Sequence, residues 1–148
     1  YEISACLVGS EMCIRDRYAT RIERLEAKGS GLEYGLERAR RNTPDGTSDE
    51  IVSFLADIAL DIRLEQIRDG GRMSQEADNA AFSDRIKVPV LILSGGKDTV
   101  ISDEMHNALT SAFPVAEQIV FPDAGHASYA ECPAKYHAEI IKFANKTE

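Results

Sequence analysis

A continuous apolar run at residues 88–93 restricts the fold of this chain more than any other feature of its sequence. The run ends at the polar stretch Ser94-Gly95-Gly96, and a short run of this kind predicts a strand buried on both faces, as in a parallel sheet. A helical pattern follows over residues 105–112, then a second strand over 118–121 and a helix that begins near Pro133. Strand, helix, strand and helix at this spacing predict a parallel α/β unit.

The preceding region, residues 18–85, is charged, rich in Ala, Leu and Ile, and without a convincing strand pattern. Asn42-Thr43-Pro44-Asp45-Gly46 has the composition of a turn, and Ser48 after it is a typical N-cap with acidic residues following. The apolar pattern then continues to Ile67, and we expect Gly70-Gly71 to end this helix. The region as a whole is predicted to be helical.

The first seventeen residues resemble translated sequencing adapter rather than natural protein. Leu7 to Arg17 reads LVGSEMCIRDR, which resembles one reading frame of the adapter used in transposase-based DNA library preparation. We therefore exclude residues 1–17 from fold reasoning and expect the natural protein to extend upstream of Tyr18. The strand at 88–93 would then lack an upstream neighbour, and the β-prone residues 3–8 could be recruited in its place. Such a pairing would reflect the β-propensity of adapter-derived residues.

The composition argues against several classes of protein. The 148 residues carry a formal net charge of −8, whereas a nucleic-acid-binding surface needs clustered Lys and Arg. Three cysteines cannot form a disulfide framework, and no apolar run approaches the roughly 20 residues of a membrane span. No segment has the pattern of a secretory signal. We expect a cytoplasmic protein that binds neither nucleic acid nor membrane.

Two chemistry-bearing residues come directly after the two predicted strands. Asp98 follows the first strand, and His126 follows the second. The carboxyl ends of parallel strands meet at one edge of a sheet, where ligands and catalytic groups gather. A carboxylate beside an imidazole fixes its tautomer and stabilises the imidazolium that forms when it accepts a proton. Either residue alone is a weak signal, but their joint placement predicts an acid–base pair.

Residues 86–142 resemble the C-terminal segment of the α/β-hydrolase superfamily. The landmarks are the strand and acid turn from Ile86 to Asp98, the histidine loop Pro122-Asp123-Ala124-Gly125-His126, and Glu131-Cys132-Pro133 opening the last helix. The resemblance implies an α/β fold in which this chain supplies a helical cap and the last two parallel strands with their helices.

The same resemblance assigns roles to residues and regions. It implies that Asp98 is the acid of a catalytic triad and that His126 is its general base. Residues 18–85 would be the cap over the active site, and residues 86–148 would belong to the core. The implied activity is hydrolysis of a small ester, lactone or related carbonyl substrate, closest to the enol-lactonase and small-esterase branch. It implies no metal and no organic cofactor.

The sequence departs from the superfamily pattern at the nucleophile. Enzymes of this superfamily place the nucleophile in a tight elbow, usually G-x-S-x-G, ahead of the acid and the histidine. No G-x-S-x-G occurs in the 148 residues, and the oxyanion-hole loop is missing as well. We therefore expect an inactive fragment of an active enzyme.

Two other functions stay open on the sequence. A non-catalytic relative that keeps the fold and pocket as a ligand-binding or interaction protein would also lack the elbow. A doubly wound nucleotide-binding domain would need a glycine-rich phosphate loop, and Gly95-Gly96 without a following G-x-x-G does not supply one.

Other candidate residues carry weaker signals. His106 and His137 lie on predicted helices among polar residues, and neither has a Cys or carboxylate at zinc-ligand spacing. Cys132 is expected to be a small, partly buried side chain rather than a nucleophile. Three arginines of the helical region could bind a substrate carboxylate, although a surface role is the expectation that we favour. They are Arg63, Arg68 and Arg72.

Overall fold

The computed structural model describes the C-terminal part of the chain continuously and the N-terminal part in pieces. The described residues are 22–23, 26–27, 31–58, 60, 63, 65–66, 69–70, 73 and 83–147. The adapter-like residues 1–17, with the expected strand at 3–8, lie outside the described residues, as do Arg68 and Arg72. Among the helices that are described, none combines the length and apolar character needed to cross a bilayer.

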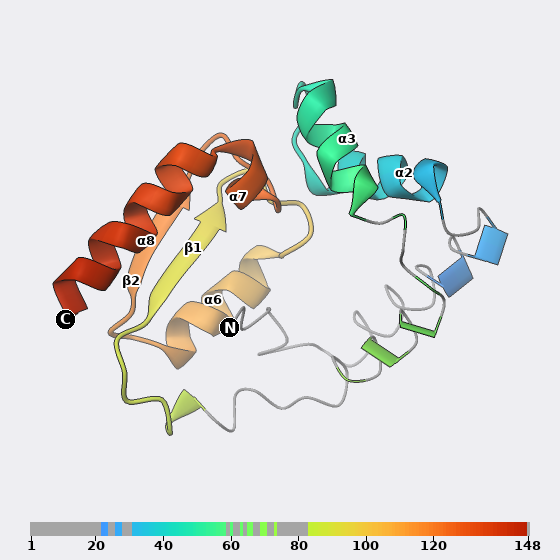
Figure 1. Ribbon diagram of the computed structural model, residues 1–148. Coiled ribbons are helices and arrows are strands. Elements are labelled where there is room, and N and C mark those ends of the chain that lie inside the picture. The colour runs from blue at the N-terminus through green and yellow to red at the C-terminus, as the bar shows by residue number, and fades with distance from the viewer. Residues whose placement is uncertain are drawn as a thin grey trace.

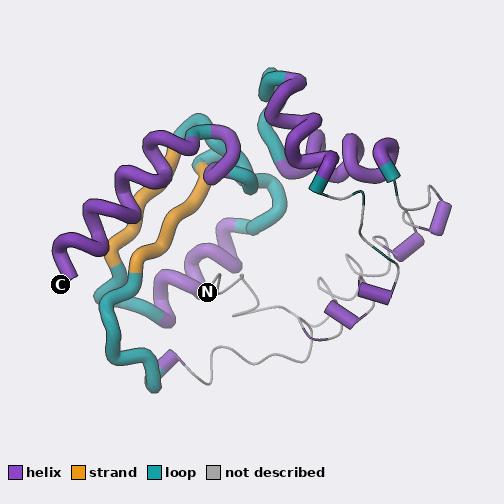
Figure 2. The backbone as a smooth tube through the Cα atoms, in the orientation of Figure 1, coloured by secondary structure: helices purple, strands orange, loops and turns teal. Residues whose placement is uncertain are grey.

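Two parallel strands form the sheet, as the sequence predicts. Strand β1 is Leu91–Gly95 and strand β2 is Glu117–Phe121, paired in register along their whole length. Helix α6, Asp103–Ala112, connects them, because two parallel strands cannot be joined by a tight turn. Figure 2 shows this strand–helix–strand path, with both strands ending at the same edge of the sheet.

Helices α6 and α8 cover opposite faces of the sheet (Figure 1). On one face, Ile92 of β1 packs in a buried cluster with Phe113 at the end of α6. Because side chains alternate along a strand, the paired register places Phe121 on the other face. There its ring lies 5.6 Å, between centroids, from that of Tyr136 on α8, Pro133–Thr147. The predicted helix beginning near Pro133 is therefore confirmed.

Strand β1 is shorter and less buried than the apolar run predicts. It begins at Leu91, because Pro89 has no N–H to donate to a ladder, and Val88 lies outside the strand with 70% of its surface exposed. Only Ile92 of the strand is buried. The other four residues of the strand are half-buried, and among the described residues β2 is the only strand paired with β1.

Ahead of the sheet, helices α2, Leu32–Asn42, and α3, Asp49–Asp57, pack against each other and form a helical pair. Gly35 allows the close contact, since a Cβ there would lie 2.6 Å from the carbonyl oxygen of Ala56. The predicted cap is confirmed: the Ser48 hydroxyl accepts a hydrogen bond from the first turn of α3. The local sequence therefore sets where this second helix begins.

The core of the helical pair includes one residue from the far end of the chain. Its buried members are Ala39, Val52, Leu55, Ala56 and Ala127. Ala127 immediately precedes a short helix, α7, Ser128–Glu131, which the sequence pattern does not predict. The helical pair is thereby packed onto the loop that follows β2.

Helix α3 ends earlier than the apolar pattern predicts. It stops at Asp57, and the next residue, Ile58, is 54% exposed. Gly70, predicted to end the helix, is itself in helical conformation. The apolar periodicity of the sequence therefore runs past the end of the helix. Val52 and Leu55 pack into the core, whereas Ile58 does not.

Candidate active site

The loops that follow β1 and β2 lie against each other at the carboxyl edge of the sheet. The Gly96 amide donates to the Phe121 carbonyl oxygen at 2.8 Å, which extends the pairing of the strands by one residue. Gly95 makes this approach possible, since a Cβ there would lie 2.1 Å from the carbonyl oxygen of Gly125. The acid turn and the histidine loop can therefore pack together because Gly95 has no side chain.

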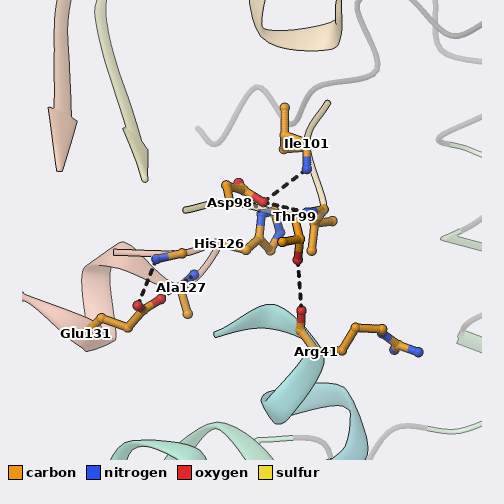
Figure 3. A network of polar contacts seen from close by, with 9 residues as sticks. Arg41, Asp98, Thr99, Ile101, His126, Ala127 and Glu131 are labelled. Carbon is orange, nitrogen blue, oxygen red and sulfur yellow. Dashed lines mark hydrogen bonds and ion pairs between the residues drawn. The ribbon is translucent and has the colours of Figure 1, made fainter. Parts of the chain in front are cut away.

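Asp98 is held in its turn by the backbone that follows it. Its Oδ1 atom accepts hydrogen bonds from the amides of Val100, at 2.7 Å, and Ile101, at 3.0 Å. This leaves Oδ2 facing His126, whose Nδ1 atom lies 2.9 Å away (Figure 3). Only 14% of the Asp98 side chain is exposed. The carboxylate is thus fixed in orientation and shielded from most of the solvent.

The surroundings of Asp98 favour its charged form. Partial burial by itself would raise the pKa of the carboxyl group, but the hydrogen bonds from His126 and from the two backbone amides outweigh it. The net effect is a pKa below the usual value of 3.8. Asp98 is therefore an acceptor at neutral pH, and the hydrogen between the two side chains belongs to His126 Nδ1.

His126 contacts the helical pair as well as Asp98. Its backbone amide donates to the carbonyl oxygen of Asn42, the last residue of α2, at 3.0 Å. Nearby, the Thr99 hydroxyl donates to the Arg41 carbonyl oxygen at 3.4 Å (Figure 3). The end of α2 therefore contacts both loops, and these carbonyl groups are ones that a helix leaves unsatisfied. The His126 imidazole remains 37% exposed.

The structure brings Asp98 and His126 together, and it separates them from the weaker candidates. His137 is exposed on α8, and His106 is half-buried on α6. Cys132 is half-buried, its Sγ atom lies 3.1 Å from the Ser128 carbonyl oxygen, and burial raises the pKa of its thiol. Arg63 is exposed. Within the part of the chain that the structure describes, no group of three or more His, Cys, Asp or Glu side chains is arranged to bind a metal.

Two contributors to the site are not visible from the sequence pattern. Asn42 acts through its carbonyl oxygen, which no side-chain motif can reveal. Glu131 counts in the sequence only as a residue that opens the last helix, but its carboxylate binds the backbone of the histidine loop. The usable signal for Glu131 is its spacing, because an acid on a short helix after a loop can turn back onto the loop amides.

This chain belongs to the α/β hydrolase fold family, whose sequence profile matches residues 37–133. Its similarity to a protein of Yersinia pestis named as a carboxymethylenebutenolidase is 53% identity over 55 residues, covering 34% of this chain and 21% of that protein. A protein of the same name from Escherichia coli K12 is 46% identical over 57 residues, covering 36% and 21%. The match thus spans about a fifth of the length of these relatives.

Solved structures share the fold at lower sequence identity. An esterase from Thermogutta terrifontis superposes with a TM-score of 0.74 at 22% identity, over 90% of this chain and 50% of the esterase. The enol-lactonase from Burkholderia xenovorans LB400 gives a TM-score of 0.73 at 18% identity, over 88% and 50%. This chain therefore corresponds to about half of each of these proteins.

Proposed function

We propose that Asp98 and His126 are the acid and the general base of a catalytic triad that hydrolyses an ester, a lactone or a related carbonyl substrate. The observation that carries the proposal is the 2.9 Å contact between His126 Nδ1 and Asp98 Oδ2, at the carboxyl edge of a parallel sheet. The carboxylate holds the proton on Nδ1, which leaves Nε2 free to accept one.

The chemical step follows from that arrangement. His126 Nε2 takes the proton of a nucleophilic side chain as that nucleophile attacks the substrate carbonyl carbon, and the acyl–enzyme bond forms. The bond between the carbonyl carbon and the leaving group breaks as the same proton passes to that group. His126 then takes a proton from a water molecule that attacks the acyl carbon, and it returns the proton to the nucleophile as the acyl–enzyme bond breaks. Asp98 stabilises the imidazolium in both halves. The 148 residues contain no G-x-S-x-G elbow, so we assign the nucleophile to a chain segment beyond this sequence.

The names of the relatives support a small lactone or ester as substrate. Carboxymethylenebutenolidase, esterase and enol-lactonase all appear among the proteins that this chain resembles. We propose that residues 18–85 are the cap that shapes the substrate pocket and that residues 86–148 belong to the core. The contacts of α2 with both catalytic loops support this division. A cytoplasmic location and an adapter origin for residues 1–17 remain predictions.

The test is to obtain the natural coding sequence upstream of Tyr18, express the extended protein and assay it with aryl esters and small lactones. We expect hydrolysis, and we expect His126→Ala to lower kcat by about 10³- to 10⁴-fold or more, as for other triads. His137→Ala, an exposed histidine on α8, is the matched control and should leave kcat unchanged.

Two results would contradict the proposal. One is an extended protein with Gly or Ala at the elbow that binds ligands without turning them over, which favours a binding protein. The other is an active protein whose kcat is unaffected by His126→Ala, which places the chemistry elsewhere.

A further inference from the structure

Three consecutive backbone amides around His126 are all hydrogen-bonded, and two of them share one partner. The amide of Gly125 donates to Glu131 Oε2 at 2.8 Å, and the amide of Ala127 donates to Glu131 Oε1 at 3.1 Å (Figure 3). The amide between them, that of His126, donates to Asn42. One carboxylate therefore spans the histidine and binds the residue on each side of it.

Of the three residues 125–127, only the histidine is exposed. Gly125 and Ala127 are buried, and His126 between them is not. A Cβ on Gly125 would lie 2.7 Å from the Cδ atom of Pro44, and Ala127 packs into the core of the helical pair. Because Gly125 and Ala127 are both held by neighbours, a shift of their backbone would displace the imidazole between them.

Glu131 is well suited to set that backbone. It is the last residue of α7, and its carboxylate lies against the histidine loop, which immediately precedes that helix. Both carboxylate oxygens are used, and hydrogen bonds from amides to a charged acceptor are stronger than neutral ones. Glu131 does not contact the Asp98 or His126 side chain in any hydrogen bond of the structure.

We propose that Glu131 is a positioning residue for His126: by binding the Gly125 and Ala127 amides, it holds the imidazole where Nδ1 meets Asp98. This proposal rests on the proposed function, because it assigns Glu131 to the same acid–base pair. A side chain that merely stabilised the start of α8 would affect unfolding but not the state of the imidazole in the folded chain.

The test uses nuclear magnetic resonance on the full chain with ¹⁵N-labelled histidine, since the imidazole nitrogen shifts report which nitrogen carries the proton. We expect Glu131→Gln to lower the fraction of His126 protonated at Nδ1 toward that of the exposed His137. Gln offers one acceptor oxygen where Glu offers two, so exchange of the Gly125 or Ala127 amide should quicken by roughly tenfold. Glu139→Gln, on α8 and paired with Lys142, is the matched control and should change neither signal.

The outcomes separate this proposal from the proposed function. If His126 of the unaltered chain is not held in the Nδ1-protonated form, the acid–base pair itself fails. If it is so held and Glu131→Gln leaves it unchanged, the role of Glu131 is overturned while the pair stands. Should Glu131→Gln unfold the chain, Glu131→Asp keeps the charge with a shorter reach and gives the same test. Unfolding of both variants would assign Glu131 to stability alone and overturn its positioning role.

Discussion

The loops that carry Asp98 and His126 meet at one edge of the sheet, but they are held in different ways. Asp98 is fixed by its own turn, because its Oδ1 atom accepts from amides two and three residues further along. The histidine loop is fixed from elsewhere: its amides bind Asn42 and Glu131, and Ala127 packs into the helical pair. The acid is thus positioned by its own turn, and the base by the short helix after its loop together with tertiary packing.

This difference determines which substitutions should disturb Asp98 and which should disturb His126. A change at a contact outside the histidine loop, such as the end of α2 or the side chain of Glu131, should disturb His126 and leave the Asp98 turn intact. A change where the two loops touch should disturb both.

Gly95→Ala should have the largest effect, because it acts where the loops meet. The added Cβ would lie 2.1 Å from the Gly125 carbonyl oxygen and 2.5 Å from that of Ala124, so backbone has to move. We expect a loss of about 3 kcal/mol in the free energy of unfolding, at the upper end for overpacking, measured by urea denaturation. Gly70→Ala is the matched control, since nothing lies within 4 Å of a Cβ there. An unchanged midpoint for Gly95→Ala would contradict the close contact of the loops.

Asp98→Asn should have an intermediate effect that depends on pH. At neutral pH we expect a loss of about 2 kcal/mol, typical of a hydrogen bond to a charged group. The folded-state pKa of Asp98 lies below the usual 3.8, so its contribution is present above that value and disappears as the pH falls through the lower, folded-state pKa. The original chain should therefore lose stability in acid relative to Asp98→Asn, as measured by urea denaturation between neutral and acid pH. Parallel curves for the two proteins would contradict the lowered pKa.

Lys97→Gln should have the smallest effect. The Lys97 ammonium lies 3.1 Å from Asp123, but both side chains are largely exposed, and such pairs contribute little. We expect a change within about 0.5 kcal/mol and no change in the imidazole signals of His126. A larger effect would show that the pair helps to hold the loops together, in addition to the backbone contacts.

The same division explains what the sequence can predict. The N-cap at Ser48, the start of α8 at Pro133, the two strands and the placement of Asp98 and His126 follow from local pattern, and the structure agrees with them. The end of α3 and the start of β1 do not follow from the apolar pattern of the sequence. Burial decides the end of α3, and the missing amide hydrogen of Pro89 decides the start of β1.

The supports of His126 are the least predictable part of the site. Asn42 contributes a backbone carbonyl from a helix far away in the sequence, and that contact depends on how the helical pair packs. Glu131 lies close to His126 in sequence, but its reach back to the loop depends on α7, a helix too short for its periodicity to be recognised. The Asn42 contact leaves no local signature, and the Glu131 contact leaves only the spacing between Glu131 and the loop.

The most direct test of the central claim is the protonation of the three imidazole rings in the unaltered chain, observed through their ¹⁵N shifts at neutral pH. We predict that His126 alone carries its proton on Nδ1, bonded to Asp98 and slow to exchange, whereas His137 behaves as a solvent-exposed histidine. A His126 ring that cannot be distinguished from His137 would contradict the pairing of acid and base on which the proposed function depends.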